Sequence, residues 1–217
     1  MNSEFDIGDL LRATMQSLRA GGVRVLFVLL LLAAAGAVVD AELVDPSPAT
    51  ALNLPLSIGA VFAQYFLTRE ALRDAGTELA SHAGFASVFV LGIVSGLAVL
   101  LGLVLLVIPG LILIIRWWVA VPVLLDRDVG VTEALRVSWR ETQGRFWTIL
   151  MALILIWLPV IAVGGMAAFA FADGTVGLAS ALIGNIALYG GLITGWHCAV
   201  AAYTLLPRDT GLTEIFG

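Results

Sequence analysis

Long apolar stretches separated by short polar segments fill most of the chain. The hydrocarbon core of a bilayer is about 30 Å thick, so a helix of about 20 apolar residues crosses it. Six stretches come close to that length: 23–39, 52–67, 84–106, 108–125, 146–172 and 175–205. Since little chain remains outside them, we expect one integral membrane domain over 1–217, an all-α polytopic membrane helical bundle with six transmembrane helices.

Two of the polar segments have apolar residues at helical spacing. Residues 3–20 place Leu11 and Leu18 on one side and polar residues on the other. The segment 131–142 repeats this arrangement around Leu135. We expect both to form inner-face amphipathic helices lying on the membrane surface, either as structural elbows that pack on the bundle or as regulatory elements that bind a partner.

The composition narrows the class of protein. Apolar residues make up 60% of the chain and charged residues 12%, whereas an ordinary soluble domain has about 45–50% and about 25%. These values exclude a soluble globule and a disordered chain. The net charge of −5 argues against nucleic acid as a partner, because binding a phosphate backbone needs a basic face.

The arginines set the expected orientation. All 11 basic residues are arginine, and cytoplasmic loops carry an excess of basic residues. With the N-terminus in the cytoplasm, ten of them fall on the inner side: Arg12, Arg19, Arg24, Arg69, Arg73, Arg127, Arg136, Arg140, Arg145 and Arg208. We therefore expect a multi-pass protein of the cell membrane with both termini cytoplasmic.

Arg116 is the basic residue that falls deep inside a predicted span. The helical rise places it about 9 Å from one end of that span and about 15 Å from the other, where an arginine costs about 2.5–3.5 kcal/mol on insertion scales. No Asp or Glu lies within the six stretches. We expect its guanidinium to meet Asn185 or Tyr189, a freed backbone carbonyl, a lipid phosphate or an anionic substrate. Alternatively, flanked by Trp117 and Trp118, it snorkels to the interface.

Asn185 and Tyr189 belong to the sixth stretch, the most polar of the six. Their spacing of four places them on the same face of a helix. The stretch has too few titratable groups at membrane depth for a proton or ion pathway. Hydrogen bonding between helices is therefore the expected role of the two side chains.

Four residues are expected to break helices. Pro109 and Gly110 predict the turn between the third and fourth spans, with one kinked or re-entrant helix as the alternative. Pro122 and Pro159 lie inside the fourth and fifth spans. Each of these prolines frees a carbonyl four residues earlier and is expected to kink its helix.

The sequence has no pattern typical of an enzyme or a metal site. The two histidines lie far apart, and no cluster of His, Cys, Asp and Glu has the spacing of metal ligands. Phosphate-binding loops, dinucleotide-binding motifs and serine-hydrolase motifs are missing. Asp126 and Asp128, beside Arg127, are interpreted as a solvated turn rather than an acid/base pair. We expect no catalytic residues, no metal and no cofactor.

Residues 107–147 carry a family resemblance. They contain Val107-Ile108-Pro109-Gly110, Arg116-Trp117, Ala120-Val121-Pro122-Val123, Glu133-Ala134-Leu135-Arg136, Ser138-Trp139 and Gly144-Arg145-Phe146-Trp147. This pattern resembles a family of prokaryotic six-span proteins that includes the membrane domain attached to some glycerophosphoryl diester phosphodiesterases and stand-alone relatives. The resemblance implies a turn at Pro109-Gly110, an arginine in the next helix and an inner amphipathic helix before the fifth span. It does not imply hydrolysis, because the metal-binding histidine and carboxylates of the phosphodiesterase domain have no counterpart here.

Together these features predict a non-enzymatic membrane module with membrane lipids as its partners, concerned with lipid handling or membrane homeostasis. In this hypothesis Arg116 meets an anionic headgroup. The alternative is a small transporter or channel with a polar cavity around Arg116, Asn185 and Tyr189. A solvent path to Arg116 would favour the transporter, and a dry, packed core would favour the module. An intramembrane enzyme ranks third, because the sequence lacks convergent catalytic residues.

Overall fold

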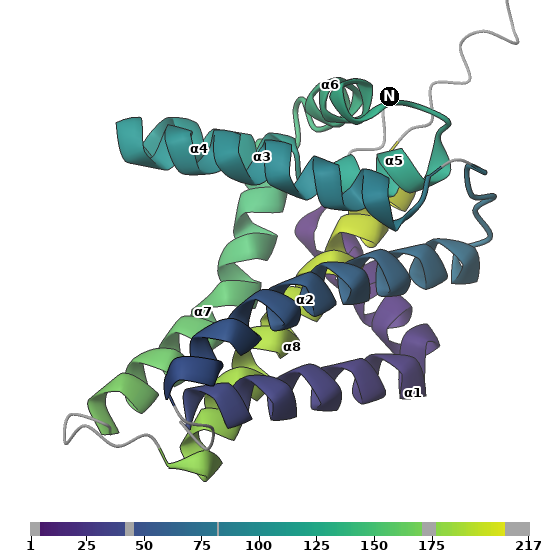
Figure 1. Cartoon of the computed structure of the whole chain (residues 1–217). Helices are drawn as coiled ribbons and strands as arrows, with labels where there is room; N and C mark the ends of the chain where they lie inside the picture. Colours follow the sequence, from purple (N-terminus) through teal and green to yellow (C-terminus); the bar gives the residue numbers. More distant parts are fainter. Residues whose placement is uncertain (1–4, 42–45, 82, 171–176, 207–217) are drawn as a thin grey trace, which may run out of the picture.

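The fold is built from helices. The computed structural model describes residues 5–41, 46–81, 83–170 and 177–206, and within these residues it contains no strand. Arg208 and the ends of three predicted segments (3–4, 171–172 and 175–176) lie outside the described residues. In chain order the helices are α1 (Ile7–Asp40), α2 (Pro46–Asp74), α3 (Phe85–Leu105), α4 (Val107–Arg116), α5 (Ala120–Asp126), α6 (Val131–Glu141), α7 (Phe146–Ala170) and α8 (Leu178–Leu205) (Figure 1).

Several of these helices have the character of membrane spans. Five stretches of the described residues are long and apolar enough to cross a membrane: Ile7–Asp40, Phe85–Leu105, Val107–Asp126, Phe146–Met166 and Leu178–Leu205. The all-α fold and the presence of several membrane-capable helices are thereby confirmed. The predicted stretch 52–67 lies in α2, which is not among the five. Asn53 and Gln64 interrupt the apolar pattern of α2, and its last turns are charged.

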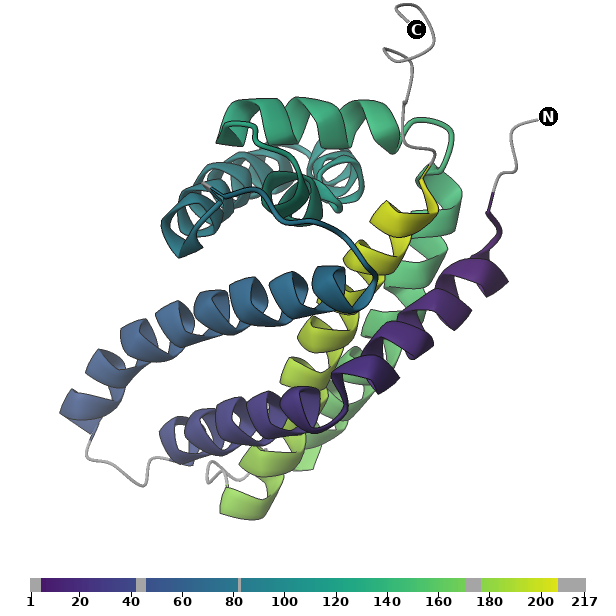
Figure 2. The same ribbon diagram turned by 90° about the vertical axis from the view of Figure 1, so that its right-hand side faces the viewer.

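The predicted surface helix 3–20 and the first span form one bent helix. α1 begins at Ile7 after a capping box, in which Asp6 and Asp9 each accept a hydrogen bond from the other's backbone N–H. The bend lies at Gly22, whose φ of 42° and ψ of −117° are readily adopted only by glycine. The two directions of α1 therefore follow from one residue, as Figure 2 shows.

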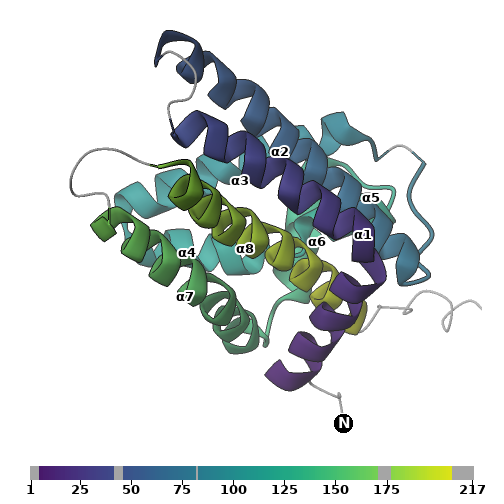
Figure 3. The ribbon, with the colours of Figure 1, turned by 90° about the horizontal axis from the view of Figure 1, so that it is seen from below.

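The longest helices pack side by side around α8. The second half of α1 runs beside α2, and α8 lies between α1 and α7 (Figures 2 and 3). α7 continues as one helix through Pro159, so this proline does not end the helix. Gly191 of α8 is buried against α7, where a Cβ would lie 2.5 Å from Cγ2 of Val160, which allows the two helices to approach closely.

The chain reverses between α3 and α4 at Leu106, with φ −159° and ψ 132°, and not at Pro109-Gly110 as expected. Pro109 and Gly110 instead lie in the first turn of α4, where proline is tolerated because its missing N–H has no helical partner. Gly110 allows the two helices to touch, since a Cβ there would lie 2.7 Å from the backbone N of Leu103.

The predicted fourth span, 108–125, is divided into two short helices. α4 ends at Arg116 and α5 begins at Ala120, with a turn between them. Pro122 lies in the first turn of α5 and has no N–H to continue the ladder back to Trp118. α6 then folds back beside α5, and Figure 1 shows α3 to α6 gathered near one end of α7 and α8.

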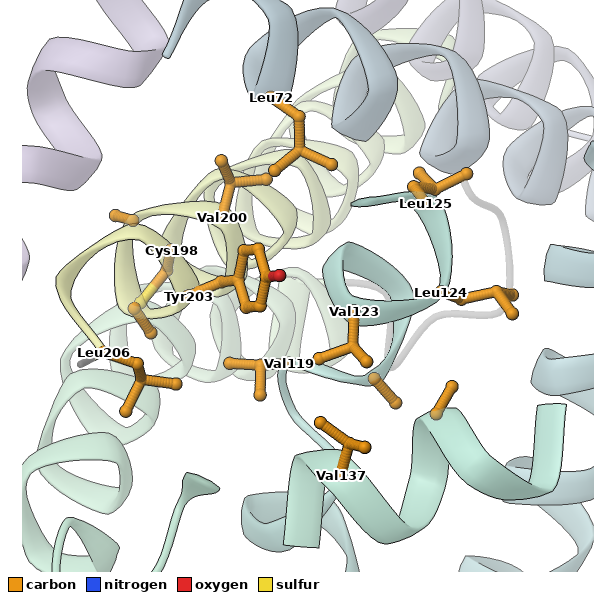
Figure 4. Close-up of a cluster of buried hydrophobic side chains, with 14 of the residues drawn as sticks. Leu72, Val119, Val123, Leu124, Leu125, Val137, Cys198, Val200, Tyr203 and Leu206 are labelled. Carbon is orange, nitrogen blue, oxygen red and sulfur yellow. The ribbon is translucent and has the colours of Figure 1, made fainter. Parts of the chain in front are cut away.

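A buried core holds this end of the molecule together. It joins α5 to the last turns of α8, the end of α2 and the buried side of α6. Figure 4 shows its side chains converging: Leu72, Val119, Val123, Leu124, Leu125, Val137, Cys198, Val200, Tyr203 and Leu206. Because this core fixes α5 and α6 against α8, it also fixes the turn that precedes α5.

Candidate functional site

Arg116 is the last residue of α4 and is half-buried. Its Cζ lies 5.5 Å from the centre of the indole ring of Trp139 on α6, within the distance of a cation–π contact. Trp139 is 36% exposed. The guanidinium is therefore held against a partly exposed aromatic side chain of α6.

The guanidinium of Arg116 has hydrogen-bond donors that are not paired in the described structure. Its Nε and Nη1 are buried and lack a hydrogen-bond partner within the described parts of the chain. None of the ion pairs found there involves Arg116. A buried donor without an acceptor costs about 1–3 kcal/mol, and more when it is charged, so this side chain is suited to an anionic acceptor.

The backbone of Arg116 is tied to α6 as well. Its carbonyl accepts hydrogen bonds from the hydroxyls of Ser138 at 2.8 Å and Thr142 at 3.2 Å. These two side chains cap the end of α4, where a carbonyl has lost its helical donor. The expected depth of Arg116 assumed one straight helix over 108–125, and the break after Arg116 removes that assumption. Contacts with α6 hold Arg116 in place instead.

A second arginine near α6 has the same features. Arg145 precedes α7, and its Cζ lies 5.2 Å from the centre of the Phe5 ring. Its Nε is also buried and without a hydrogen-bond partner among the residues described. Ile115, the neighbour of Arg116, packs with Ile149, which lies one turn after Arg145.

Asn185 and Tyr189 lie together, as expected, but apart from Arg116. The amide of Asn185 donates to the carboxylate of Asp40 at 2.7 Å and to the carbonyl of Ala181 at 2.9 Å. Both side chains pack on α1 at Gly36. Trp118, near Arg116, meets α8 at Gly195, which is about 15 Å along the helix from Asn185. The structure thus gives Asn185 a partner on α1 rather than bringing the three residues around one cavity.

Sequence reasoning missed a polar network at the other end of α8. Tyr203 is 2% exposed and donates to the carboxylate of Asp126. Arg127 donates to the Tyr203 oxygen at 3.3 Å and pairs with Glu141. Burial lowers the pKa of Arg127, but the hydrogen bond to Tyr203 and the charge of Glu141 outweigh it and raise that pKa. We call Asp126, Arg127, Glu141 and Tyr203 the Tyr203 network, which joins α5, α6 and α8.

A second unexpected polar cluster lies at the bend of α1. Arg24 pairs with Glu70 at 2.8 Å and with Asp74 at 2.6 Å, so it joins α1 to the end of α2. On the neighbouring α8, Nδ1 of the buried His197 lies 2.7 Å from the hydroxyl of Ser17. Charge pattern alone did not reveal these pairs, because the partners are far apart in sequence.

The break between α4 and α5 lies beside a cavity of about 270 Å³. Its lining residues include Gln64, Thr68 and Trp117 but not Arg116, Asn185 or Tyr189. No group of three or more His, Cys, Asp and Glu residues in the described part of the chain is arranged to hold a metal ion.

Comparison of the chain with protein-family models, with curated proteins and with solved structures gives no match. The proposed function therefore depends on the geometry around Arg116.

Proposed function

We propose that this chain is a non-enzymatic integral membrane protein that binds the headgroup of an anionic lipid through Arg116. The observation that carries this proposal is the guanidinium of Arg116, which rests on Trp139 with two buried donors unpaired in the described structure. A planar guanidinium matches the oxygens of a phosphate in a two-pronged hydrogen bond. Stacking on Trp139 restricts the guanidinium before the anion arrives, which lowers the entropy lost on binding.

The surroundings of Arg116 support a lipid rather than a soluble anion. α6 packs Ala134, Leu135 and Val137 into the buried core and exposes Arg140 on its other side. A basic residue on an exposed helix face is attracted to anionic headgroups. Lipid phosphates lie at the membrane interface, whereas a deeper arginine would need a partner from the protein, such as a carboxylate or a backbone carbonyl. Arg145 adds a second cationic group with an unpaired donor in the described region.

The proposed topology has six spans, with both termini and α6 on the cytoplasmic side of a prokaryotic cell membrane. α2 serves as the second span. Glu70 and Asp74 at the charged end of α2 pair with Arg24 at the bend of α1. This contact supports placing Arg24 on the same side of the membrane as the arginines of α2. A chain of this topology would fit the six-span family that residues 107–147 resemble.

Cysteine labelling tests this topology. Cys198, the one cysteine in the sequence, is buried. Labelling by a maleimide therefore reports on cysteines introduced at exposed positions. In cells, an impermeant maleimide should label Gly177→Cys and leave Thr132→Cys unlabelled until the membrane is opened. The reverse pattern, or both sites labelled from outside, would reject the proposed topology.

Lipid retention tests the proposed function. Arg116→Leu should lose most of the anionic lipid that co-purifies with the protein, because it removes the cation and both unpaired donors. Arg136→Leu is the matched control, since Arg136 lies on the exposed side of α6 and already pairs with Glu133. Equal anionic lipid in a folded Arg116→Leu protein would contradict the proposal.

A small transporter is the second candidate, favoured by one observation. Helices broken within the membrane line the substrate sites of many transporters, and the α4–α5 break lies beside a cavity. Uptake of a solute into proteoliposomes, lost when the break is altered by Pro122→Ala, would support this function.

A further inference from the structure

The cavity at the α4–α5 break is unusually rich in tryptophan. The chain has 6 tryptophans, and four of them line this cavity: Trp117, Trp118, Trp157 and Trp196. They come from the turn after α4, from α7 and from α8. The flat face of an indole carries a negative electrostatic potential and attracts cations more strongly than other aromatic rings.

Two backbone carbonyls of lining residues are free to accept a hydrogen bond or to face a cation. The N–H of Trp118 donates to the carbonyl of Ile115 at 3.4 Å and not to that of Ile114, four residues back. Pro122 has no N–H to offer the carbonyl of Trp118. Ile114 and Trp118 both line the cavity, so two carbonyls of lining residues have lost their helical donors. The C-terminal end of a helix is also the negative end of its dipole.

Positive charge is kept away from the cavity. Its lining residues include no Arg, Asp or Glu. Arg116 ends α4, but its guanidinium lies over Trp139 on α6. The edge of Trp118 formed by Cζ2 and Cη2 contacts α8, because a Cβ at Gly195 would lie 3.4 Å from both atoms. The indole Nε1 of Trp118 is buried and has no hydrogen-bond partner in the described part of the chain.

We propose that this cavity binds an organic cation, such as a quaternary ammonium with an aromatic or aliphatic group. The indole faces and the freed carbonyls of Ile114 and Trp118 hold the positive charge, and the apolar lining accommodates the rest of the molecule. An anion would find no cationic lining residue. A neutral molecule of the same shape would fit but would lack the cation–π attraction to the indole faces and the attraction of a charge to the carbonyls. This site is separate from Arg116 and does not depend on it.

Calorimetric titration with benzyltrimethylammonium tests the proposal. Neopentylbenzene is its neutral counterpart, with carbon in place of nitrogen, and should bind at least about tenfold more weakly, as expected from the loss of a desolvated cation–π contact. Trp157→Leu should weaken binding of the cation by about ten- to thirty-fold, and Trp157→Phe should recover part of the loss. Trp147→Leu is the matched control, because Trp147 lies on the same helix, is 69% exposed and does not line the cavity.

Three results would overturn the proposal: equal or tighter binding of the neutral compound, no binding of the cation at millimolar concentration by the folded wild-type protein, or equal losses from Trp157→Leu and Trp147→Leu. Folding is checked separately through the heat-induced exposure of Cys198 to a fluorescent maleimide. If Trp157→Leu fails this check, the comparison between charged and neutral ligands on the wild-type protein still decides the question.

Discussion

The guanidinium of Arg116 lies over the indole ring of Trp139, which places the end of α4 against α6. Two bonds from Ser138 and Thr142 to the Arg116 carbonyl hold the same junction. α6 therefore positions both the side chain and the backbone of Arg116. The proposed lipid site is a property of this junction, and α4 alone would not form it.

Trp139→Leu should weaken binding of anionic lipid by about twofold to thirtyfold, because a cation–π contact contributes about 0.5–2 kcal/mol. Trp139→Phe should lose less, since an aromatic face remains. Lipid titration of the purified variants measures both effects. Trp147→Leu serves as the control, because Trp147 pairs with Phe146 and not with an arginine. Unchanged lipid affinity in Trp139→Leu would show that Trp139 does not position Arg116.

Gly36→Ala should destabilise the contact between α1 and α8 by about 1–3 kcal/mol, the usual cost of overpacking. A Cβ at this position would lie 2.1 Å from Oδ1 of Asn185, so one helix must move. The thermal exposure of Cys198 measures the loss. Adding Asn185→Ala should restore part of the stability lost to Gly36→Ala.

The matched control for Gly36 is Gly59→Ala on α2, where a new Cβ would meet no atom within 4 Å. This variant should be neutral or slightly stabilising, because alanine favours helix over glycine by about 1 kcal/mol. Equal melting temperatures for Gly36→Ala and Gly59→Ala would contradict the close approach of α1 and α8.

Tyr203→Phe should cost about 1–3 kcal/mol, because it removes the hydroxyl that donates to Asp126 and leaves that carboxylate without its buried donor. Arg127 loses its bond to Tyr203 but keeps its ion pair with Glu141. The same thermal assay measures the change. Tyr65→Phe is the comparison: its hydroxyl accepts a bond from Arg69 within a single helix, and such pairs contribute only about 0.2–0.5 kcal/mol. If Tyr203→Phe costs no more than Tyr65→Phe, the Tyr203 network does not stabilise the packing of α5, α6 and α8.

Gly22→Ala should lower stability by about 1–3 kcal/mol through backbone strain, since a φ of 42° with ψ of −117° is sparsely populated by residues with a Cβ. The space around Gly22 is open, so a steric clash cannot cause this effect. Gly164→Ala in α7, also in open space, should be neutral or stabilising. A neutral Gly22→Ala would mean that α1 is not bent at this residue.

Hydropathy located most of the long helices because the length of an apolar run is a local property of the chain. The predicted stretches 84–106 and 146–172 correspond closely to α3 and α7. The turn at Leu106 was not predicted at the right residue, because it depends on the close packing of Gly110 against Leu103. Proline and glycine mark a change of direction, but tertiary contacts decide on which side of them it falls.

Tertiary contacts also decide the geometry of the candidate site, and the sequence could reveal only part of it. Arg116 was identified from the sequence, since a charge within an apolar run is unusual. Its position against α6 depends on Ser138 and Thr142, and the spacing of residues on α4 holds no information about them. The Asn185–Asp40 and Tyr203–Asp126 bonds likewise join residues far apart in the chain. A single sequence reveals no such pairing.

Native mass spectrometry with titrated phosphatidylglycerol tests the central claim most directly, because it measures the affinity of the protein for one anionic lipid at a time. We expect Arg116→Leu to bind phosphatidylglycerol at least about tenfold more weakly than the wild type, because losing one hydrogen bond to a charged group reduces the affinity by about this factor. Arg136→Leu should match the wild type, and phosphatidylcholine should bind all three proteins weakly. Equal phosphatidylglycerol affinity in the wild type and Arg116→Leu, with both proteins folded, would contradict anion binding by Arg116.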